Sequence, residues 1–276
     1  YADAVRRLDD PQAAPMLAPS QGSHIVLGRE FLPGESAILV PHTDDGRVLF
    51  AIPWHGRVVV GTTDVPVSEV SMEPKPFEEE IEFLLAHAAR YLAKDPARDD
   101  ILGMFAGLRP LVGARESKRT AKLSRDHSIR VSRSGLITIA GGKWTTYRKM
   151  AEDVVNEAAK VAGLEPRPSR TESLRIHGYE PEAERYGALE VYGSDAEGVL
   201  ELARANPAWA ERVHPRLDVT AAQVVWAARR EMARTVEDVL SRRTRASLLD
   251  ARAAREAAAR VREILKSEEG RMKREE

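Results

Sequence analysis

The chain has 276 residues, no cysteine and a formal net charge of −1. The lack of cysteine excludes disulfides, thiolate metal ligands and a cysteine nucleophile, and it suits a reducing cytoplasm. The balanced charge gives no global signature of nucleic-acid or membrane binding, and no run of about 18 apolar residues is present that could span a membrane as a helix.

The beginning of the chain is unusual. Its first eight residues contain no methionine and have the pattern of a helix that has already begun. We therefore expect a fragment whose N-terminal part is missing, with a processed chain as the alternative. The length fits one or two domains, or part of a larger assembly.

Four short β-strands are predicted in the next part of the chain, at residues 23–27, 37–41, 47–54 and 57–63. Turn sequences at 43–46 and 55–56 have hairpin chemistry, and such short connections imply antiparallel neighbours. This region therefore predicts a meander and not a parallel βαβ unit.

A helix is predicted over residues 77–93, where apolar side chains recur at helical spacing and the first turn holds three glutamates. A strand follows at 101–109, and the pattern at 128–132 and 136–140 predicts a hairpin around a Ser-Gly turn. The next helix runs to about residue 162 and carries its apolar residues on one face.

The composition changes at residues 163–169, which have linker chemistry, and the rest of the chain reads as helical. The candidate helices cover 182–192, 195–206, 220–232, 235–241 and 250–266. Asp195 and Thr220 are candidate N-caps. Residues 267–276 form a charged tail for which we expect no order.

The corner at residues 141–149, GGKWTTYRK, joins a short apolar strand to a helix. Gly141 and Gly142 let the backbone approach a ligand without a Cβ in the way. The threonines can cap the helix, and the helix start together with Lys143 favours an anion or a partly negative oxygen. An ordinary tight turn is the alternative, and local chemistry leaves both open.

Positive charge is concentrated between Arg109 and Lys149. Eleven basic and two acidic residues lie there, a local net charge of +9. This excess indicates an anionic ligand, because arginine binds phosphate or carboxylate through a bidentate fork. Arg109 ends an apolar strand and should point from a rigid frame, and Arg125 lies just before a strand. A solvated basic loop is the alternative for Lys118, Arg119 and Lys122.

His24 lies on a short strand and can titrate near neutral pH, although a lone histidine on a strand is often structural. The seven histidines show no HxH or HExxH spacing, so no metal site is predicted. No serine or threonine occupies a GxSxG nucleophile elbow.

Six motifs occur in the order found in FAD-dependent glycerol-3-phosphate dehydrogenase, the aerobic respiratory family. They are GSHIV at 22–26, FAIPW at 50–54, GTTD at 61–64, GLRP at 107–110, SRD at 124–126 and GGKWTTYRK at 141–149. The run TVEDVLSRRTR at 235–245 also resembles the helical domain of that family. The resemblance covers nearly the whole chain, but the GxGxxG nucleotide-binding unit with which the family begins has no counterpart in this sequence.

The residues alone indicate an anion-binding α+β unit with a helical appendage. The resemblance implies an α+β fold: an antiparallel substrate-binding sheet plus a partial FAD-domain segment, followed by an all-α C-terminal domain. The implied domains are a β-rich substrate-binding domain at 1–107, the C-terminal segment of the FAD-binding domain at 108–165, and the helical domain at 166–276.

The resemblance also implies a reaction, the oxidation of sn-glycerol 3-phosphate to dihydroxyacetone phosphate by hydride transfer to FAD, with electrons passed on to a quinone. The implied catalytic residues are His24, Arg109 and Lys143. The implied substrate-binding residues are His24, Arg109, Arg125 and Lys143. The implied cofactor-binding residues are Gly141, Gly142, Lys143, Trp144 and Thr145.

Two other functions remain open. A glycerol-3-phosphate oxidase, which passes electrons to oxygen, would carry the same motifs. The fragment could also be inactive and act only as a helical module that docks on a partner or a membrane. We expect a cytoplasmic protein with no nucleic-acid partner; peripheral association with the inner face of the cell membrane and a homodimer are left open.

Overall fold

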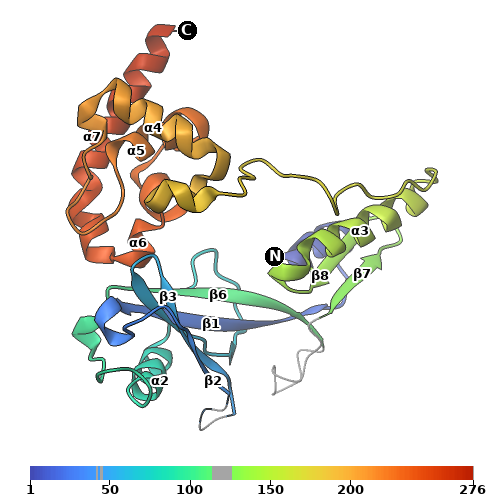
Figure 1. Ribbon diagram of the computed structural model, residues 1–276. Helices are drawn as coiled ribbons and strands as arrows, with labels where there is room; N and C mark the ends of the chain where they lie inside the picture. The colour runs from blue at the N-terminus through green and yellow to red at the C-terminus, as the bar shows by residue number, and fades with distance from the viewer. Residues whose placement is uncertain (42, 44–45, 114–125, 276) are drawn as a thin grey trace.

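The computed structural model describes residues 1–41, 43, 46–113 and 126–275 (Figure 1). A six-stranded antiparallel sheet dominates its N-terminal half. Its strands are β1 (Leu17–Gly28), β2 (Ile38–Val40), β3 (Leu49–Trp54), β4 (Arg57–Gly61), β5 (Val65–Pro66) and β6 (Gly103–Val112). The order is β2-β3-β4-β1, with β5 and β6 also paired to β1. The predicted α+β class is confirmed.

Strand β1 is the centre of this sheet. It pairs with β4 over residues 24–28 and with β6 over residues 17–26. The sequence predicted only residues 23–27 as a strand, because the part before it contains a proline and polar residues that are typical of loops. Those polar side chains are nevertheless buried: Ser20 and Ser23 have no exposed surface and Gln21 is 3% exposed.

The two faces of the sheet differ. One face packs against helix α2 (Glu78–Ala88), and the shared core includes Ile25, Val60 and Leu84. Side chains alternate between faces along a strand, so His24 lies on the opposite face, which we call the site face. Strand β3 follows the same rule: Ala51 is buried, whereas Phe50 beside it is 40% exposed.

A second, smaller unit follows the sheet. Strands β7 (His127–Val131) and β8 (Ile137–Gly141) form the predicted hairpin, and the 3-10 turn η4 (Trp144–Thr146) leads into helix α3 (Tyr147–Val161). Helix α1 (Ala2–Asp9) packs against β8, which also contacts β6. This arrangement places the Gly-Gly corner beside one end of the large sheet (Figure 1).

An extended segment joins α3 to a C-terminal helical unit (Figure 1). The unit contains α4 (Ala196–Ala205), α5 (Ala221–Arg230), α6 (Ala246–Leu249) and α7 (Ala251–Glu275). Shorter turns are η1 (Arg29–Phe31), η2 (Arg98–Asp100), η5 (Ala183–Asp195), η6 (Pro207–Trp209) and the π-helical η7 (Asp238–Arg243). The core is formed mainly by α5 and α7, through residues such as Val224, Val225 and Val261. None of the described helices is long and apolar enough to cross a membrane.

Three predictions in the helical unit need correction. The helix expected at 182–192 is a series of 3-10 turns, because Gly187 and Gly193 adopt positive φ angles of 55° and 54° that interrupt it. The helix expected at 235–241 is mostly the π-helical turn η7. The tail is helical to Glu275, and Glu268 in it is 4% exposed and bonded to Arg229 at 2.6 Å.

Of the predicted helix N-caps, some form and others do not. Thr220 accepts a hydrogen bond from the Gln223 amide at the start of α5, as predicted. Asp195 makes no side-chain cap bond to α4. Thr146 closes the turn η4, because its Oγ1 donates to the Lys143 carbonyl at 2.9 Å, and it makes no cap bond to α3.

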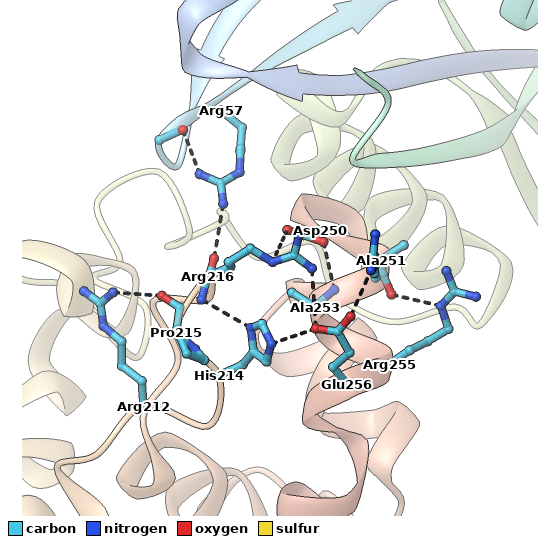
Figure 2. Close-up of polar contacts among 12 residues, drawn as sticks. Arg57, Arg212, His214, Pro215, Arg216, Asp250, Ala251, Ala253, Arg255 and Glu256 are labelled. Atoms are coloured by element: carbon cyan, nitrogen blue, oxygen red, sulfur yellow. Dashed lines mark hydrogen bonds and ion pairs between the residues drawn. The ribbon is translucent and has the colours of Figure 1, made fainter. Parts of the chain in front are cut away.

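The helical unit is joined closely to the large sheet. The Ala251 amide donates to the Leu102 carbonyl at 2.8 Å, and a Cβ at Gly103 would lie 2.1 Å from the Leu248 carbonyl oxygen. Arg57, at the β3–β4 turn, donates from Nη2 to the Arg216 carbonyl at 3.1 Å (Figure 2). The two units are therefore in direct contact at this junction.

Candidate functional site

Arg109 is held on the site face by the segment that follows β4. Its Nη2 donates to Thr62 Oγ1 and to the Thr63 carbonyl, both at 3.0 Å, and its Nη1 lies 3.3 Å from Asp64 Oδ1. The guanidinium covers Gly22, where a Cβ would come within 2.4 Å of Nη2. The side chain keeps 32% of its surface exposed. A fixed and partly exposed cation is suited to bind an anion.

A buried carboxylate supports this arrangement from the other face of the sheet. Glu80 is 3% exposed and accepts hydrogen bonds from Ser23 Oγ and Gln21 Nε2 at 2.7 Å, from the Phe77 amide at 2.8 Å, and from Thr63 Oγ1. Burial alone would raise the pKa of Glu80, but these four hydrogen bonds outweigh it and hold the pKa below its usual range. Glu80 therefore fixes Thr63, which in turn fixes Arg109.

Asp64 is part of the same frame. Ser20 Oγ donates to Asp64 Oδ1, and Ser20 lies directly opposite Arg109 in the β1–β6 pairing. The Ser23 amide donates to Thr63 Oγ1 at 2.8 Å. Strands β1 and β6 thus meet the segment after β4 at one point, and the backbone as well as the side chains determines where Arg109 lies.

His24 lies on the same face of β1 as Gly22, two residues further along the strand. Its ring stacks on Phe105 with centroids 4.9 Å apart, and it pairs with Gly61, where a Cβ would come within 2.2 Å of the ring. Burial, and secondarily the charge of Arg109, lower the pKa of His24 to about 4. The Nδ1 atom is buried without a hydrogen-bond partner among the described residues. His24 is therefore a neutral imidazole at physiological pH. It can accept a hydrogen bond and, as a weaker base than an ordinary histidine, a proton.

The glycines of the strand–helix corner are required by the turn itself. Gly141 and Gly142 have φ angles of 81° and 73°, which side chains rarely adopt. A Cβ on Gly141 would lie 2.6 Å from the Asp126 carbonyl oxygen, and one on Gly142 would lie 2.4 Å from Met150 Sδ. The tight-turn interpretation thus explains both glycines. It does not exclude a ligand at the residues that follow.

Those following residues present an uncovered helix start. Lys143, Trp144 and Thr145 are all exposed. The Trp144 side chain is 84% exposed, and its ring stacks on Tyr147 with centroids 5.3 Å apart. A large aromatic surface beside the start of a helix is suited to a planar ligand with partial negative charge.

The structure brings some of the predicted residues together. His24 and Arg109 share the site face and interact electrostatically. The corner approaches the same end of the sheet: a Cβ on Gly141 would lie 3.0 Å from Val112, which is about 10 Å along β6 from Arg109 at the usual strand rise. Within the described part of the chain, no hydrogen bond or ion pair joins Lys143 to His24 or Arg109. Arg125 lies outside the described residues.

The local positive charge is smaller than the sequence window suggested. Arg148 pairs with Glu152 at 2.6 Å, and Lys149 pairs with Asp153 at 2.7 Å. Both acids lie just beyond the window, one helical turn further along α3. Lys118, Arg119 and Lys122 lie outside the described residues, so the solvated-loop alternative stays open.

Sequence reasoning missed Glu80, Asp64 and Phe105. Glu80 was read only as an acidic residue in the first turn of a helix, and its neighbours in space are far away in sequence. Asp64 belongs to the GTTD motif, which was noted without a role for this residue. The Thr-Thr-Asp run directly after an apolar strand was the available signal for it.

Two family models match this chain. The model described as FAD dependent oxidoreductase matches residues 1–148, and the model of the C-terminal domain of alpha-glycerophosphate oxidase matches residues 109–276. The chain belongs to the FAD-dependent oxidoreductase family. The family resemblance drawn from the six motifs is thereby confirmed, and FAD is the cofactor of this oxidoreductase family.

Similar proteins agree with this family. A mitochondrial glycerol-3-phosphate dehydrogenase of Arabidopsis thaliana is 37% identical over 97% of this chain and 47% of its own length. The mitochondrial glycerol-3-phosphate dehydrogenase of Homo sapiens is 38% identical over 96% of this chain and 39% of its own length. The chain thus spans less than half the length of these two relatives.

A solved structure in the same family has a similar fold. The glycerol-3-phosphate dehydrogenase from Bacillus halodurans, complexed with FAD, matches with a TM-score of 0.77 at 29% identity. The match covers 99% of this chain and 59% of that one. Sheet, hairpin and helical unit therefore occur together in both FAD-dependent oxidoreductases.

Proposed function

We propose that this chain forms the substrate side of a flavoenzyme that oxidises sn-glycerol 3-phosphate to dihydroxyacetone phosphate. One observation carries the proposal: a pre-positioned cation and a neutral histidine lie on the same face of one sheet. Arg109 is held by residues 62–64 and stays partly exposed, and His24 has a pKa lowered to about 4. The names of the relatives support this substrate.

Arg109 and His24 have different roles toward the substrate. Arg109 binds the phosphate, and its fixed geometry orients the rest of the molecule. His24, neutral and partly shielded from water, accepts the proton of the hydroxyl on carbon 2. Arg125 and Lys143 complete the proposed substrate site, Arg125 on the family resemblance alone and Lys143 also by its place at the exposed helix start.

The corner at 141–146 fits the flavin side of such a site, because Lys143, Trp144 and Thr145 are exposed around an uncovered helix start. When bound there, FAD supplies the acceptor for the hydride from carbon 2. Lys143 and the first amides of η4 and α3 would stabilise negative charge on the cofactor. Gly141 and Gly142 set the direction of this corner.

Anaerobic mixing of substrate with the intact, FAD-loaded enzyme that contains this chain tests the proposal. We expect sn-glycerol 3-phosphate to bleach the flavin absorbance, and glycerol, which lacks the phosphate, to do so only weakly. Arg109→Ala and Arg125→Ala should each raise KM by about tenfold or more, because a charged hydrogen bond contributes roughly 1.5–3 kcal/mol. Unchanged KM in Arg109→Ala would refute the phosphate role.

The electron acceptor is proposed to be a quinone, on the family resemblance. The alternative is an oxidase, and peroxide formed in step with substrate oxidation would decide for it. Reduction of a soluble quinone analogue without peroxide would decide for the dehydrogenase. Peripheral attachment to a membrane goes with the quinone proposal, and flotation with anionic lipid vesicles tests it.

The 276-residue chain by itself should retain no FAD, because it has no GxGxxG unit for the adenosine and diphosphate. A purified chain that shows no flavin absorption band after gel filtration with FAD is the expected result. A yellow chain would show that the corner and the site face are sufficient for binding.

A further inference from the structure

A cavity of about 360 Å³ lies at the junction between the large sheet and the helical unit. The sheet contributes the β3–β4 turn, with His55 and Arg57. The helical unit contributes residues 187–188, 190–192, 216–219, 223, 243–246 and 249. This volume is within the range of small-ligand pockets, and the cavity is separate from the candidate site, which uses none of these residues.

Among the described residues, not every guanidinium donor of Arg57 has a hydrogen-bond acceptor at this junction (Figure 2). Its Nη1 donates to the Gly56 carbonyl and its Nη2 to the Arg216 carbonyl, both at 3.1 Å. Its Nε is buried with no hydrogen-bond acceptor among the described residues. Arg57 forms no ion pair with any carboxylate in the described part of the chain. A buried guanidinium donor without an acceptor indicates that a partner is missing.

The nearby carboxylates cannot serve as that partner. Asp250 and Glu256 both lie 3.6 Å from the Arg216 guanidinium. Asp250 also accepts the Ala253 amide at 2.8 Å, and Glu256 is bonded to His214 at 2.9 Å (Figure 2). These acids are thus already committed to groups of the helical unit.

The rest of the lining is also rich in cations. Arg243 donates from Nε to the Glu231 carbonyl at 2.9 Å. The Arg245 side chain is exposed and makes no hydrogen bond or ion pair within the described residues. Two carboxylates line the cavity, Glu190 and Asp218, and Asp218 already pairs with Arg212 at 2.8 Å. Arg216 already pairs with Asp250 and Glu256. Arg57, Arg243 and Arg245 therefore face Glu190, the lining carboxylate for which no ion pair is present among the described residues.

We propose that this junction cavity binds a small organic phosphate, with Arg57 and Arg245 as its charge partners. Arginine from two separate elements is well suited to the several oxygens of a phosphate group. The phenol of Tyr192 adds a polar contact, and Leu217 gives an apolar wall for the organic part. A ligand here contacts both units and holds them together.

Calorimetric titration of the 276-residue chain with inorganic phosphate at low salt tests the proposal. The titration uses an Arg109→Ala, Arg125→Ala background, which removes both arginines that are proposed to bind phosphate at the candidate site. We expect one saturable binding event, weakened about tenfold by Arg57→Gln and by Arg245→Gln, as expected when one charged partner is removed. Arg255→Gln, an exposed site on α7, should leave it unchanged.

Residue 245 has a φ of 56°. Glutamine is chosen there because, like arginine, it is unbranched at Cβ, so the substitution should not change the backbone strain. Thermal unfolding with and without phosphate gives a second readout, because a ligand that binds only the folded chain raises Tm, and a tighter ligand raises it more at the same concentration. Arg57→Lys should restore part of the affinity that Arg57→Gln loses.

Three outcomes overturn the proposal: no saturable binding up to roughly 10 mM phosphate, equal binding in the Arg57→Gln, Arg245→Gln double variant, or equal loss in Arg255→Gln. Failure of this site leaves the proposed oxidation untouched, because that depends on Arg109 and His24. Conversely, phosphate binding at the junction would not support the proposed oxidation, because the junction contains neither Arg109 nor His24.

Discussion

Burial keeps the His24 imidazole neutral, and this makes the stability of the fold depend on pH. The pKa of an unfolded histidine is near 6.5, whereas burial and the charge of Arg109 lower the folded value to about 4. As the pH falls, the unfolded chain therefore takes up this proton first. The neutral His24 contributes stability that is complete above pH 6.5 and is lost as the pH falls toward 4.

We predict that replacing His24 by glutamine reduces this pH dependence. The free energy of unfolding of the native chain should fall more steeply between pH 6.5 and 4 than that of His24→Gln, since only the native chain has this buried imidazole. Urea denaturation across that range measures both slopes. His177→Gln is the control, because His177 is 83% exposed. Identical slopes for the native chain and His24→Gln would contradict the assignment.

Glu80 acts on the site without facing it. We predict that Glu80→Gln destabilises the chain by about 1–3 kcal/mol, because four donors lose a charged acceptor. If the proposed function holds, Glu80→Gln in the intact, FAD-loaded enzyme should also raise KM for sn-glycerol 3-phosphate, because Thr63 no longer holds Arg109. Glu79→Gln, an exposed neighbour in the same helical turn, should change neither quantity. A stability loss with unchanged KM would limit Glu80 to a structural role.

At the scale of elements, three glycines allow the cost of a strained backbone angle to be compared with the cost of a steric clash. All have positive φ, but a Cβ on Gly135 would meet nothing within 4 Å, one on Gly142 would meet the flexible Met150, and one on Gly141 would meet a backbone oxygen. We predict that alanine costs about 1 kcal/mol at Gly135, more at Gly142 and most at Gly141, where the neighbour cannot move. Urea unfolding of the three variants gives the order, and an equal cost at all three would contradict it.

The elements that depend on residues close together in the chain were predictable from the sequence. The hairpin of β7 and β8, the helix α2 and the Thr220 cap depend on turn residues, periodicity or one side chain a few positions away. The full length of β1 was not predictable, because its polar residues are buried by partners such as Glu80, 57 residues from Ser23. His24 and Arg109 were identified by family motifs, whereas the frame that holds Arg109 depends on contacts between distant segments.

At the scale of the molecule, the C-terminal tail anchors the helical unit. Glu268 accepts two hydrogen bonds from Arg229, at 2.6 and 2.9 Å, and a third from Arg271. Burial alone would raise the pKa of Glu268, but these bonds outweigh it and lower the pKa. The acidic side chain ties the end of α7 to α5, which explains why a tail without an apolar stripe is helical.

Glu268→Ala should therefore destabilise the helical unit by about 1–3 kcal/mol, because Arg229 loses its carboxylate partner. Truncation after Lys266 should have a similar effect. Glu263→Ala removes a 70% exposed glutamate on the same helix and should cost little. Circular dichroism during thermal unfolding measures all three. A tail that contributes nothing would leave Tm unchanged in both the truncated chain and Glu268→Ala.

The position of β1 at the centre of the sheet also determines the order in which the site can form. Ser20 and Arg109 face each other across β1 and β6, although 88 residues separate them in the chain. Closing so long a loop has a large entropic cost that only the completed sheet repays. The β3–β4 hairpin can form early from local contacts, but Arg109 reaches residues 62–64 only when β6 joins β1. A partly folded chain therefore carries no functional half-site, and substrate binding reports completed folding of the sheet.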